Sequence, residues 1–266
     1  MGALPSLDEI RAGHGFKHEY ERYLPLSRYV FRPIGFQLTW LAVRLGLTSE
    51  AVSWLSAAAG VLGLAGLMSP RISMVWAGLA LLLLFNLLDC VDGSIARAMG
   101  TGNPYGRFLD SVCGAVVDLG FWAAVGVMTF RHPDLLVGLP GPSDSTFWLA
   151  VGGVTCFLAV LLHEVERAYE QLLHAAWEAP GGGGPTAGAA REPWLKTLAR
   201  NLRVRETQYA FLAVAIVAGA VDVLLAGYIL YYFAHILAAL RVYVARGRAV
   251  RVGARGTPGP AEKRAP

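Results

Sequence analysis

Long apolar runs constrain the fold of this chain more than any other feature of its sequence. In a bilayer every backbone N–H and C=O must be satisfied within the spanning segment, so a helix needs about 20 mostly apolar residues to cross. With 55% hydrophobic and only 16% charged residues, the composition does not suit a soluble enzyme. Six stretches are long enough to span, at about 47–68, 72–98, 104–130, 146–169, 206–223 and 224–245. The sequence therefore predicts an all-α polytopic membrane protein with six transmembrane helices.

The segments around these stretches predict the remaining organisation. Residues 1–26 carry scattered charges and form an N-terminal cytoplasmic segment without a secretory signal. A six-helix membrane domain covers 27–246; it includes a flexible Gly- and Pro-rich loop at 178–193 and is followed by a disordered cytoplasmic tail at 247–266.

Residues 27–45 form an amphipathic segment ahead of the first span. Apolar residues recur there at helical spacing, at Val30, Ile34, Leu38, Leu41 and Leu45. This pattern predicts an N-terminal interfacial helix lying in the cytoplasmic face of the membrane. The alternative is a soluble helix packed on the cytosolic loops.

Lys and Arg residues are distributed unevenly between the connections. They gather in the N-terminal segment, in the connections after the second and fourth spans, and in the tail, whereas the other side has only Arg71 and Arg131. Because cytoplasmic loops carry the excess of Lys and Arg, both termini are predicted to be cytoplasmic in a multi-pass protein of the cell membrane. The net charge of +4 thus reflects membrane topology, and no motif predicts a nucleic-acid partner.

Aspartates cluster where the second span ends and the third begins, although carboxylates inside membranes are rare and costly. Asp89 and Asp92 close the second span, while Asp110 and Asp118 lie in the first half of the third. Carboxylates brought this close repel one another unless a cation lies among them. A hard divalent ion, Mg²⁺ or Mn²⁺, binds through a few carboxylates together with substrate phosphates. The cluster, with Arg97 beside it, predicts metal-assisted attack on a phosphoryl group.

A spaced motif joins these two spans. It reads Asp89-x-x-Asp92-Gly93-x-x-Ala96-Arg97 and, after eight residues, Gly106-x-x-x-Asp110. Seven of the eight fixed positions in the signature of the CDP-alcohol phosphatidyltransferase family match, so the chain resembles that family. The resemblance implies metal ligation by Asp89, Asp92 and Asp110. It also implies contacts to the CDP moiety from Gly93, Ala96, Arg97 and Gly106.

The resemblance further implies an activity and its partners. A family enzyme transfers a substituted phosphate group from a CDP-linked lipid or alcohol donor, here most plausibly CDP-diacylglycerol, to an acceptor hydroxyl and releases CMP. The acceptor would be a small polar or phosphorylated alcohol, and membrane lipids would surround the site. Such a reaction belongs to phospholipid biosynthesis.

The eighth position of the signature is Gly114, where the family has an aspartate taken to be a metal ligand and the general base. Asp118 lies one helical turn further along, so Asp110 and Asp118 are the expected catalytic carboxylates. Three interpretations stay open. Asp118 or a water takes the acceptor proton, or the acceptor is already ionised, or transfer is lost and the chain binds a CDP-linked ligand or partner. A transporter is the rival class, but the acids cluster at one edge and no repeated halves are visible.

Three other groups of residues each have two interpretations. A polar group near the end of the fourth span either orients the acceptor or anchors the helix, namely His163, Glu164 and Arg167. A basic group before the fifth span either holds an anionic acceptor or binds anionic lipid headgroups, namely Lys196, Arg200, Arg203 and Arg205. Glycines in the first span permit close helix packing or a homodimer, namely Gly60, Gly63 and Gly66.

Overall fold

The computed structural model describes residues 4–14, 23–139, 145–175 and 194–256 of the 266-residue chain. Within these ranges every regular element is a helix, which confirms the predicted all-α membrane protein. Among the described residues, five helices are long and apolar enough to cross a membrane: α4 (Ser49–Leu67), α5 (Ile72–Ala98), α6 (Pro104–Arg131), α7 (Ser145–Tyr169) and α11 (Val221–Gly256). The predicted loop at 178–193 lies outside the described residues.

The predicted fifth span differs from expectation. It is the 14-residue helix α10 (Arg205–Ala218), which extends only about 21 Å at 1.5 Å per residue and is short for a membrane core. Gly219, with φ of 60°, adopts the left-handed conformation and ends the helix, so the apolar run does not continue as one element. The last helix, α11, continues to Gly256. The segment predicted to be a disordered tail from residue 247 is therefore helical as far as 256.

The chain forms two compact units, residues 1–156 with 193–227 and residues 157–192 with 228–266. In the second unit the end of α7, the π-helical turn η4 (Glu170–His174) and the later part of α11 pack together. Tyr169 stacks on Tyr243 with ring centroids 4.0 Å apart, and Arg246 donates a 2.9 Å hydrogen bond to the Tyr169 hydroxyl. The motif residues all lie in the first unit.

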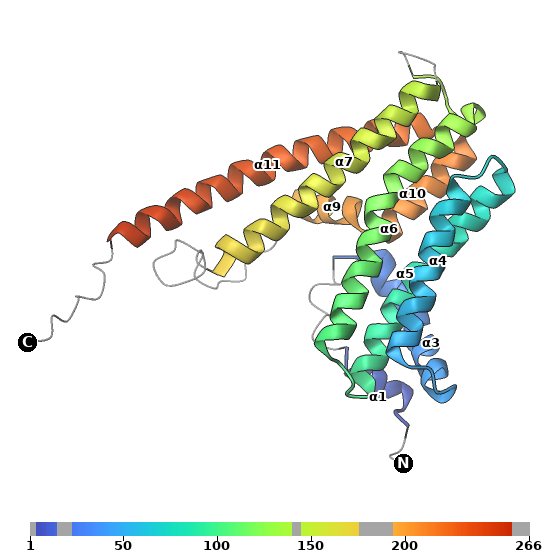
Figure 1. Ribbon diagram of the computed structural model, residues 1–266, viewed down its shortest axis with the longest axis vertical. Helices are drawn as coiled ribbons and strands as arrows, with labels where there is room; N and C mark the ends of the chain where they lie inside the picture. The colour runs from blue at the N-terminus through green and yellow to red at the C-terminus, as the bar shows by residue number, and fades with distance from the viewer. Residues whose placement is uncertain (1–3, 15–22, 140–144, 176–193, 257–266) are drawn as a thin grey trace, which may run out of the picture. The chain divides into compact units, whose positions relative to one another are not determined.

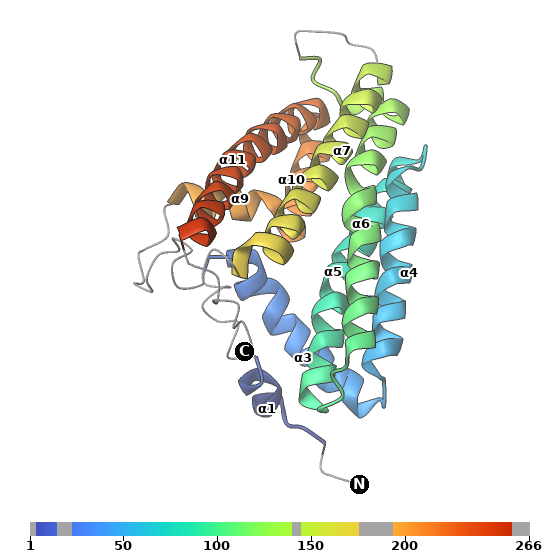
Figure 2. The ribbon, with the colours of Figure 1, turned by 60° about the vertical axis from the view of Figure 1, so that its left-hand side comes forward.

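Helices α4, α5 and α6 lie side by side in the first unit, as both Figure 1 and Figure 2 show. Glycines let α4 and α5 approach to backbone contact. A Cβ added at Gly66 would lie 2.6 Å from the Gly78 Cα, and one at Gly63 would lie 2.8 Å from the Leu82 side chain. A Cβ at Gly60 would overlap Val117 of α6. Of the two interpretations of these glycines, the structure shows close packing within the chain.

The segment before the first span is helical, as predicted, from the π-helical turn η2 (Ser27–Phe31) through α3 (Arg32–Arg44). Its small residues, among them Gly35 and Ala42, are buried against the bundle. The large apolar residues Ile34, Leu41 and Leu45 are exposed. This exposed apolar face supports the interpretation of a helix lying in the membrane interface. The short helices α1 (Leu7–Ala12), η3 (Pro133–Leu135) and α9 (Trp194–Arg203) complete the first unit.

A tight turn brings the end of α5 next to the start of α6. Gly100 adopts φ of 64°, and the amides of Gly100 and Thr101 bond back to the carbonyls of Arg97 and Ala96 at 3.2 and 2.9 Å. Asn103 then caps α6 by accepting a hydrogen bond from a backbone amide of its first turn. The last turns of α5 and the first turns of α6, which carry the motif, are thereby neighbours in space.

Candidate functional site

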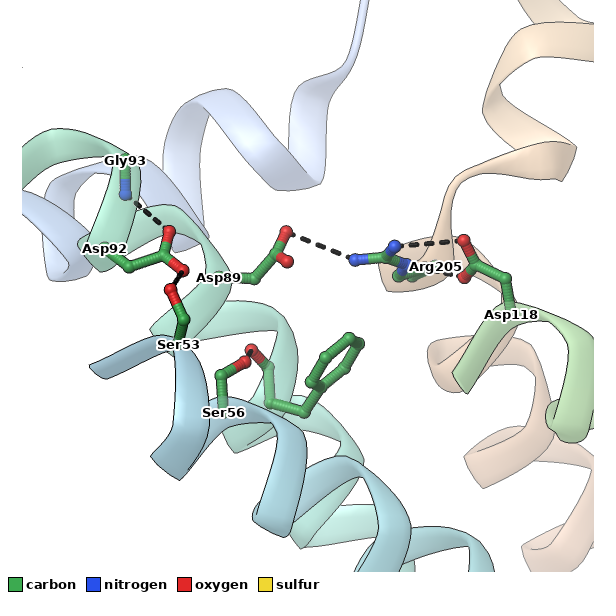
Figure 3. A network of polar contacts seen from close by, with 8 residues as sticks. Ser53, Ser56, Asp89, Asp92, Gly93, Asp118 and Arg205 are labelled. Atoms are coloured by element: carbon green, nitrogen blue, oxygen red, sulfur yellow. Dashed lines mark hydrogen bonds and ion pairs between the residues drawn. The ribbon is translucent and has the colours of Figure 1, made fainter. Parts of the chain in front are cut away.

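Asp92 is the most buried carboxylate of the motif, with only 4% of its surface exposed. The Ser53 hydroxyl of α4 donates to Asp92 Oδ2 at 2.5 Å, and the Gly93 amide donates to Asp92 Oδ1 at 2.5 Å (Figure 3). A buried carboxylate needs such donors because it has lost its hydration. Both oxygens of Asp92 are therefore held in fixed directions by the protein.

A row of serines on α4 supports this part of α5. Ser49 donates to the Asp92 carbonyl at 2.9 Å, and Ser56 donates to the Phe85 carbonyl at 3.1 Å. Together with Ser53 they occupy positions i, i+4 and i+7, which lie on one face of a helix. Sequence reasoning missed this row, although its spacing within an apolar span was a signal that could have found it.

Asp89 and Asp118 are joined by a single guanidinium, that of Arg205 at the start of α10. Arg205 Nη1 lies 3.2 Å from Asp89 Oδ2, while Nε and Nη2 donate to the two oxygens of Asp118 at 2.6 and 2.9 Å (Figure 3). The bidentate contact to Asp118 is the strong form of a charge-assisted pair. The structure thus brings Asp118 to the motif through Arg205, a residue 87 positions away in the chain.

Gly114, where the family signature has aspartate, lies directly beneath this guanidinium. A Cβ added at Gly114 would lie 2.7 Å from Arg205 Nη2, closer than real Cβ contacts allow. The guanidinium carbon also lies 5.0 Å from the centroid of the Phe85 ring, within range of a cation–π contact. The Arg205 side chain therefore occupies the space that a side chain at position 114 would need.

The residues predicted to contact the CDP moiety lie around the turn between α5 and α6. The Arg97 guanidinium lies along Gly93, since a Cβ there would be 3.2 Å from Nη1, and its Nη2 donates to Ser94 Oγ at 3.1 Å. Ala96 is half-buried one turn after Asp92. The Gly106 amide donates to Asn103 Oδ1 at 2.8 Å in the cap of α6. Arg97 is thus the one cation among the predicted CDP contacts.

Asp110 lies exposed on α6, about two turns after the start of that helix. Asp89 and Asp92 lie near the end of α5 and Asp110 near the start of α6, so the three predicted ligands belong to neighbouring helix ends. Their hard oxygen donors suit a divalent ion. However, no group of three His, Cys, Asp or Glu side chains among the described residues is arranged to hold a metal ion.

A second ion would lack donors at this site. Gly114 offers no side chain, and both oxygens of Asp118 accept hydrogen bonds from Arg205. The three predicted ligands have the oxygen chemistry that one divalent ion prefers, whereas a second ion would have no donor at position 114 and would lie beside the positive charge of Arg205.

The other predicted polar groups are divided among several helices. Glu164 and Arg167 of α7 pair with each other at 2.6 Å in the second unit. Of the basic group before the fifth span, Arg200 belongs to α9 and stacks near the Tyr23 ring, with its guanidinium carbon 5.7 Å from the ring centroid. Arg205 has hydrogen bonds to the aspartates of the motif.

Comparison with known proteins agrees with the motif. The sequence model of a family described as CDP-alcohol phosphatidyltransferase matches residues 47–240. A phosphatidylinositol phosphate synthase of Mycobacteroides abscessus is 36% identical over 107 residues, which is 38% of this chain and 48% of that protein. Synthases of the same name from Mycolicibacterium smegmatis and Cutibacterium acnes are 34% and 28% identical over 121 and 130 residues. These alignments cover 43% and 49% of this chain and 49% and 57% of those proteins, so the chain spans about half the length of the curated relatives it matches.

Proposed function

The chain belongs to the CDP-alcohol phosphatidyltransferase family, and we propose that it transfers a substituted phosphate group from CDP-diacylglycerol to the hydroxyl of a polar alcohol, releasing CMP. The observation that carries this proposal is the family match over residues 47–240, together with the position of Asp89, Asp92 and Asp110 at the neighbouring ends of two apolar helices. A lipid-linked donor suits a site built into membrane helices.

The motif residues around the turn between α5 and α6 would bind the donor. Asp89, Asp92 and Asp110 would hold a divalent ion, Mg²⁺ or Mn²⁺, as expected in a family that generally depends on divalent metals. When bound, the ion would neutralise charge on the donor's diphosphate. The Arg97 guanidinium would donate to the phosphate oxygens, and the glycines Gly93 and Gly106 would let the nucleotide approach the backbone.

The acceptor is proposed from the activity after which the relatives are named. Because the relatives are phosphatidylinositol phosphate synthases, a phosphorylated inositol is the first acceptor to test. Other small polar alcohols, such as glycerol phosphate and serine, are the comparison set. The acceptor oxygen forms a bond to the phosphorus that carries the diacylglycerol, the bond from that phosphorus to the CMP oxygen breaks, and CMP leaves with the electron pair.

The proton of the acceptor hydroxyl needs a destination that Asp118 does not offer in the arrangement described. Both Asp118 oxygens already accept from Arg205, so Asp118 would have to leave that pair before it could act as a base. Asp110, exposed near the start of α6, is the other predicted catalytic carboxylate and has no contact with Arg205 among the described hydrogen bonds. We assign proton removal to Asp110 or to a water that it orients.

The distribution of Lys and Arg supports a cytoplasm-facing site in the cell membrane. The motif belongs to the end of the second span and the start of the third, whose connection is on the side rich in Lys and Arg. A water-soluble acceptor and the released CMP would then exchange with the cytoplasm.

The test is CMP release by the purified full-length chain in detergent micelles. CDP-diacylglycerol and Mg²⁺ are supplied with each acceptor, with matched reactions that lack acceptor, lack donor or contain a metal chelator. The expected result is CMP formation that needs the donor, the metal and one class of acceptor. Donor-independent ion flux in liposomes, without CMP formation, would instead identify a transporter.

A second candidate function is supported by Gly114 and Arg205. A family member without the eighth aspartate could bind the CDP-linked ligand and not turn it over. Metal-dependent binding of CDP-diacylglycerol, with no CMP formed from any acceptor in the panel, would identify this binding protein.

A further inference from the structure

Position 114 and Arg205 are geometrically matched. The backbone of Gly114 is buried, and the first atom of any side chain placed there would lie 2.7 Å from Arg205 Nη2. The space that an aspartate would use is thus taken by the end of a long side chain from α10. The glycine and the arginine are parts of one local arrangement.

The Arg205 guanidinium also pairs with the negative charges of two aspartates, Asp89 and Asp118. It contacts Asp89 at 3.2 Å and both oxygens of Asp118, and its side chain is only 21% exposed. A charge so shielded from water is stable only when it is paired and hydrogen-bonded. The Phe85 ring, whose centroid lies 5.0 Å from the guanidinium carbon, adds a cation–π contact. The result is a fixed monovalent cation between two aspartates.

We infer that Arg205 is a resident cation that holds Asp89 and Asp118 where a second metal ion would otherwise be needed, so that this chain works with a single divalent ion. The inference rests on the proposed function. The one ion would be held by the three predicted ligands, Asp89, Asp92 and Asp110. Arg205 is then a positioning residue, since it acts through the orientation of Asp89.

Two features of the site support a single ion. The guanidinium donates to one oxygen of Asp89, and the other oxygen lies outside this contact. Both Asp118 oxygens accept hydrogen bonds from Arg205, so an ion bound to Asp118 would lie beside the guanidinium. A second ion beside Arg205 would also be repelled by its charge.

The test counts Mn²⁺ ions bound to the purified full-length chain by equilibrium dialysis and records their electron paramagnetic resonance spectrum. The wild-type protein is expected to bind one Mn²⁺ and to show no broadening from a second ion about 4 Å away. The double variant Gly114→Asp/Arg205→Gln removes the resident cation and restores a carboxylate, so it is expected to bind two ions with a dipolar-broadened spectrum.

The control variants separate charge from size. Gly114→Asn/Arg205→Gln adds a side chain of the same size without its charge and is expected to bind one ion. Arg71→Gln removes a cation at the other end of α5 and is expected to match the wild type. Arg205→Lys, which keeps the charge, is expected to bind one ion as well.

Each outcome bears on one of the two proposals. Two ions in the wild type, or one ion in Gly114→Asp/Arg205→Gln, would overturn the inference about Arg205 and leave the proposed transfer intact. No Mn²⁺ in the wild type would overturn the metal assignment of the proposed function and the inference with it. The number of Mn²⁺ ions bound to the wild-type protein tests the inference of a single ion even if the double variant fails to fold.

Discussion

The Ser53 hydroxyl on the first span and the Asp92 carboxylate on the second are joined by a 2.5 Å hydrogen bond. Asp92 is almost completely buried, and its other oxygen accepts from the Gly93 amide. Because bulk water does not reach this carboxylate, a lost donor is not simply replaced by solvent. Residues of α4 that belong to no signature therefore control how a signature aspartate is presented.

Substitution of Ser53 by alanine is expected to lower both stability and metal affinity. The buried Asp92 oxygen loses its donor, which costs about 1–3 kcal/mol in the free energy of unfolding. Loss of a group that orients a metal ligand weakens metal binding about 10-fold. Thermal unfolding in detergent and Mn²⁺ titration measure the two effects.

Ser56→Ala is the matched control for this prediction, because Ser56 donates to a backbone carbonyl and touches no signature aspartate. It is expected to lower thermal stability and to leave the Mn²⁺ affinity unchanged. Equal Mn²⁺ affinities in Ser53→Ala and the wild type would show that Ser53 does not orient a ligand.

Single replacements of Asp89, Asp92 and Asp110 by asparagine are each expected to abolish metal-dependent nucleotide binding. Asparagine keeps the size of the side chain and removes the charge that holds a hard cation. Binding of CDP with and without Mg²⁺, followed by calorimetry, measures the loss. Asp134→Asn, in the short helix η3, is the control and should bind as the wild type does. Metal-dependent binding that survives in all three variants would rule out the proposed ligand set.

Asp118→Asn distinguishes a base from a partner of Arg205. In the structure Asp118 holds the guanidinium with both oxygens, so the expected result is a reduced rate of CMP release with an unchanged dependence of rate on pH. Loss of the acidic limb of the rate profile would instead identify Asp118 as the base. The comparison uses the wild type and Asp118→Glu across the same pH range.

The motif itself could be predicted from sequence because it is local. Asp89 and Asp92 are one turn apart on a helix, and a short turn with Gly100 leads directly to Asp110, so spacing alone places them together. Arg205 is 116 positions from Asp89, and its contact depends on how α10 packs against α5 and α6. The sequence showed Arg205 only as one of several basic residues before an apolar run, and nothing local indicated which of them turns inward.

The length of α10 is a second feature that could not be predicted from the sequence. The apolar run from 206 to 223 is long enough to span, but Gly219 adopts a left-handed conformation that ends the helix after Ala218. Glycine inside an apolar run is compatible with a continuing helix or with its end, and packing decides between them. The exposed large apolar residues of α3, by contrast, followed from their helical spacing.

The close glycine contact between α4 and α5 leads to a prediction about stability. The same contact sets the distance between Ser53 on α4 and Asp92 on α5. A methyl group added at Gly78 would lie 2.6 Å from the Leu67 amide nitrogen and 2.7 Å from the Gly63 carbonyl oxygen. These are backbone atoms, which cannot rotate away, so the helices must separate. Such overpacking costs about 1–3 kcal/mol, more than the roughly 1 kcal/mol by which alanine favours a helix over glycine.

Gly78→Ala is therefore expected to lower the midpoint of thermal unfolding in detergent. It is also expected to weaken Mn²⁺ binding, because separation of α4 from α5 stretches the bond between Ser53 and Asp92. Gly153→Ala in α7 is the matched control, since a Cβ there has no atom within 4 Å among the described residues outside its own helix backbone, and it should be neutral or slightly stabilising. Equal unfolding midpoints for the two variants would contradict the backbone contact at Gly78, whereas a lower midpoint with unchanged Mn²⁺ affinity would show that the ligand geometry does not depend on this packing.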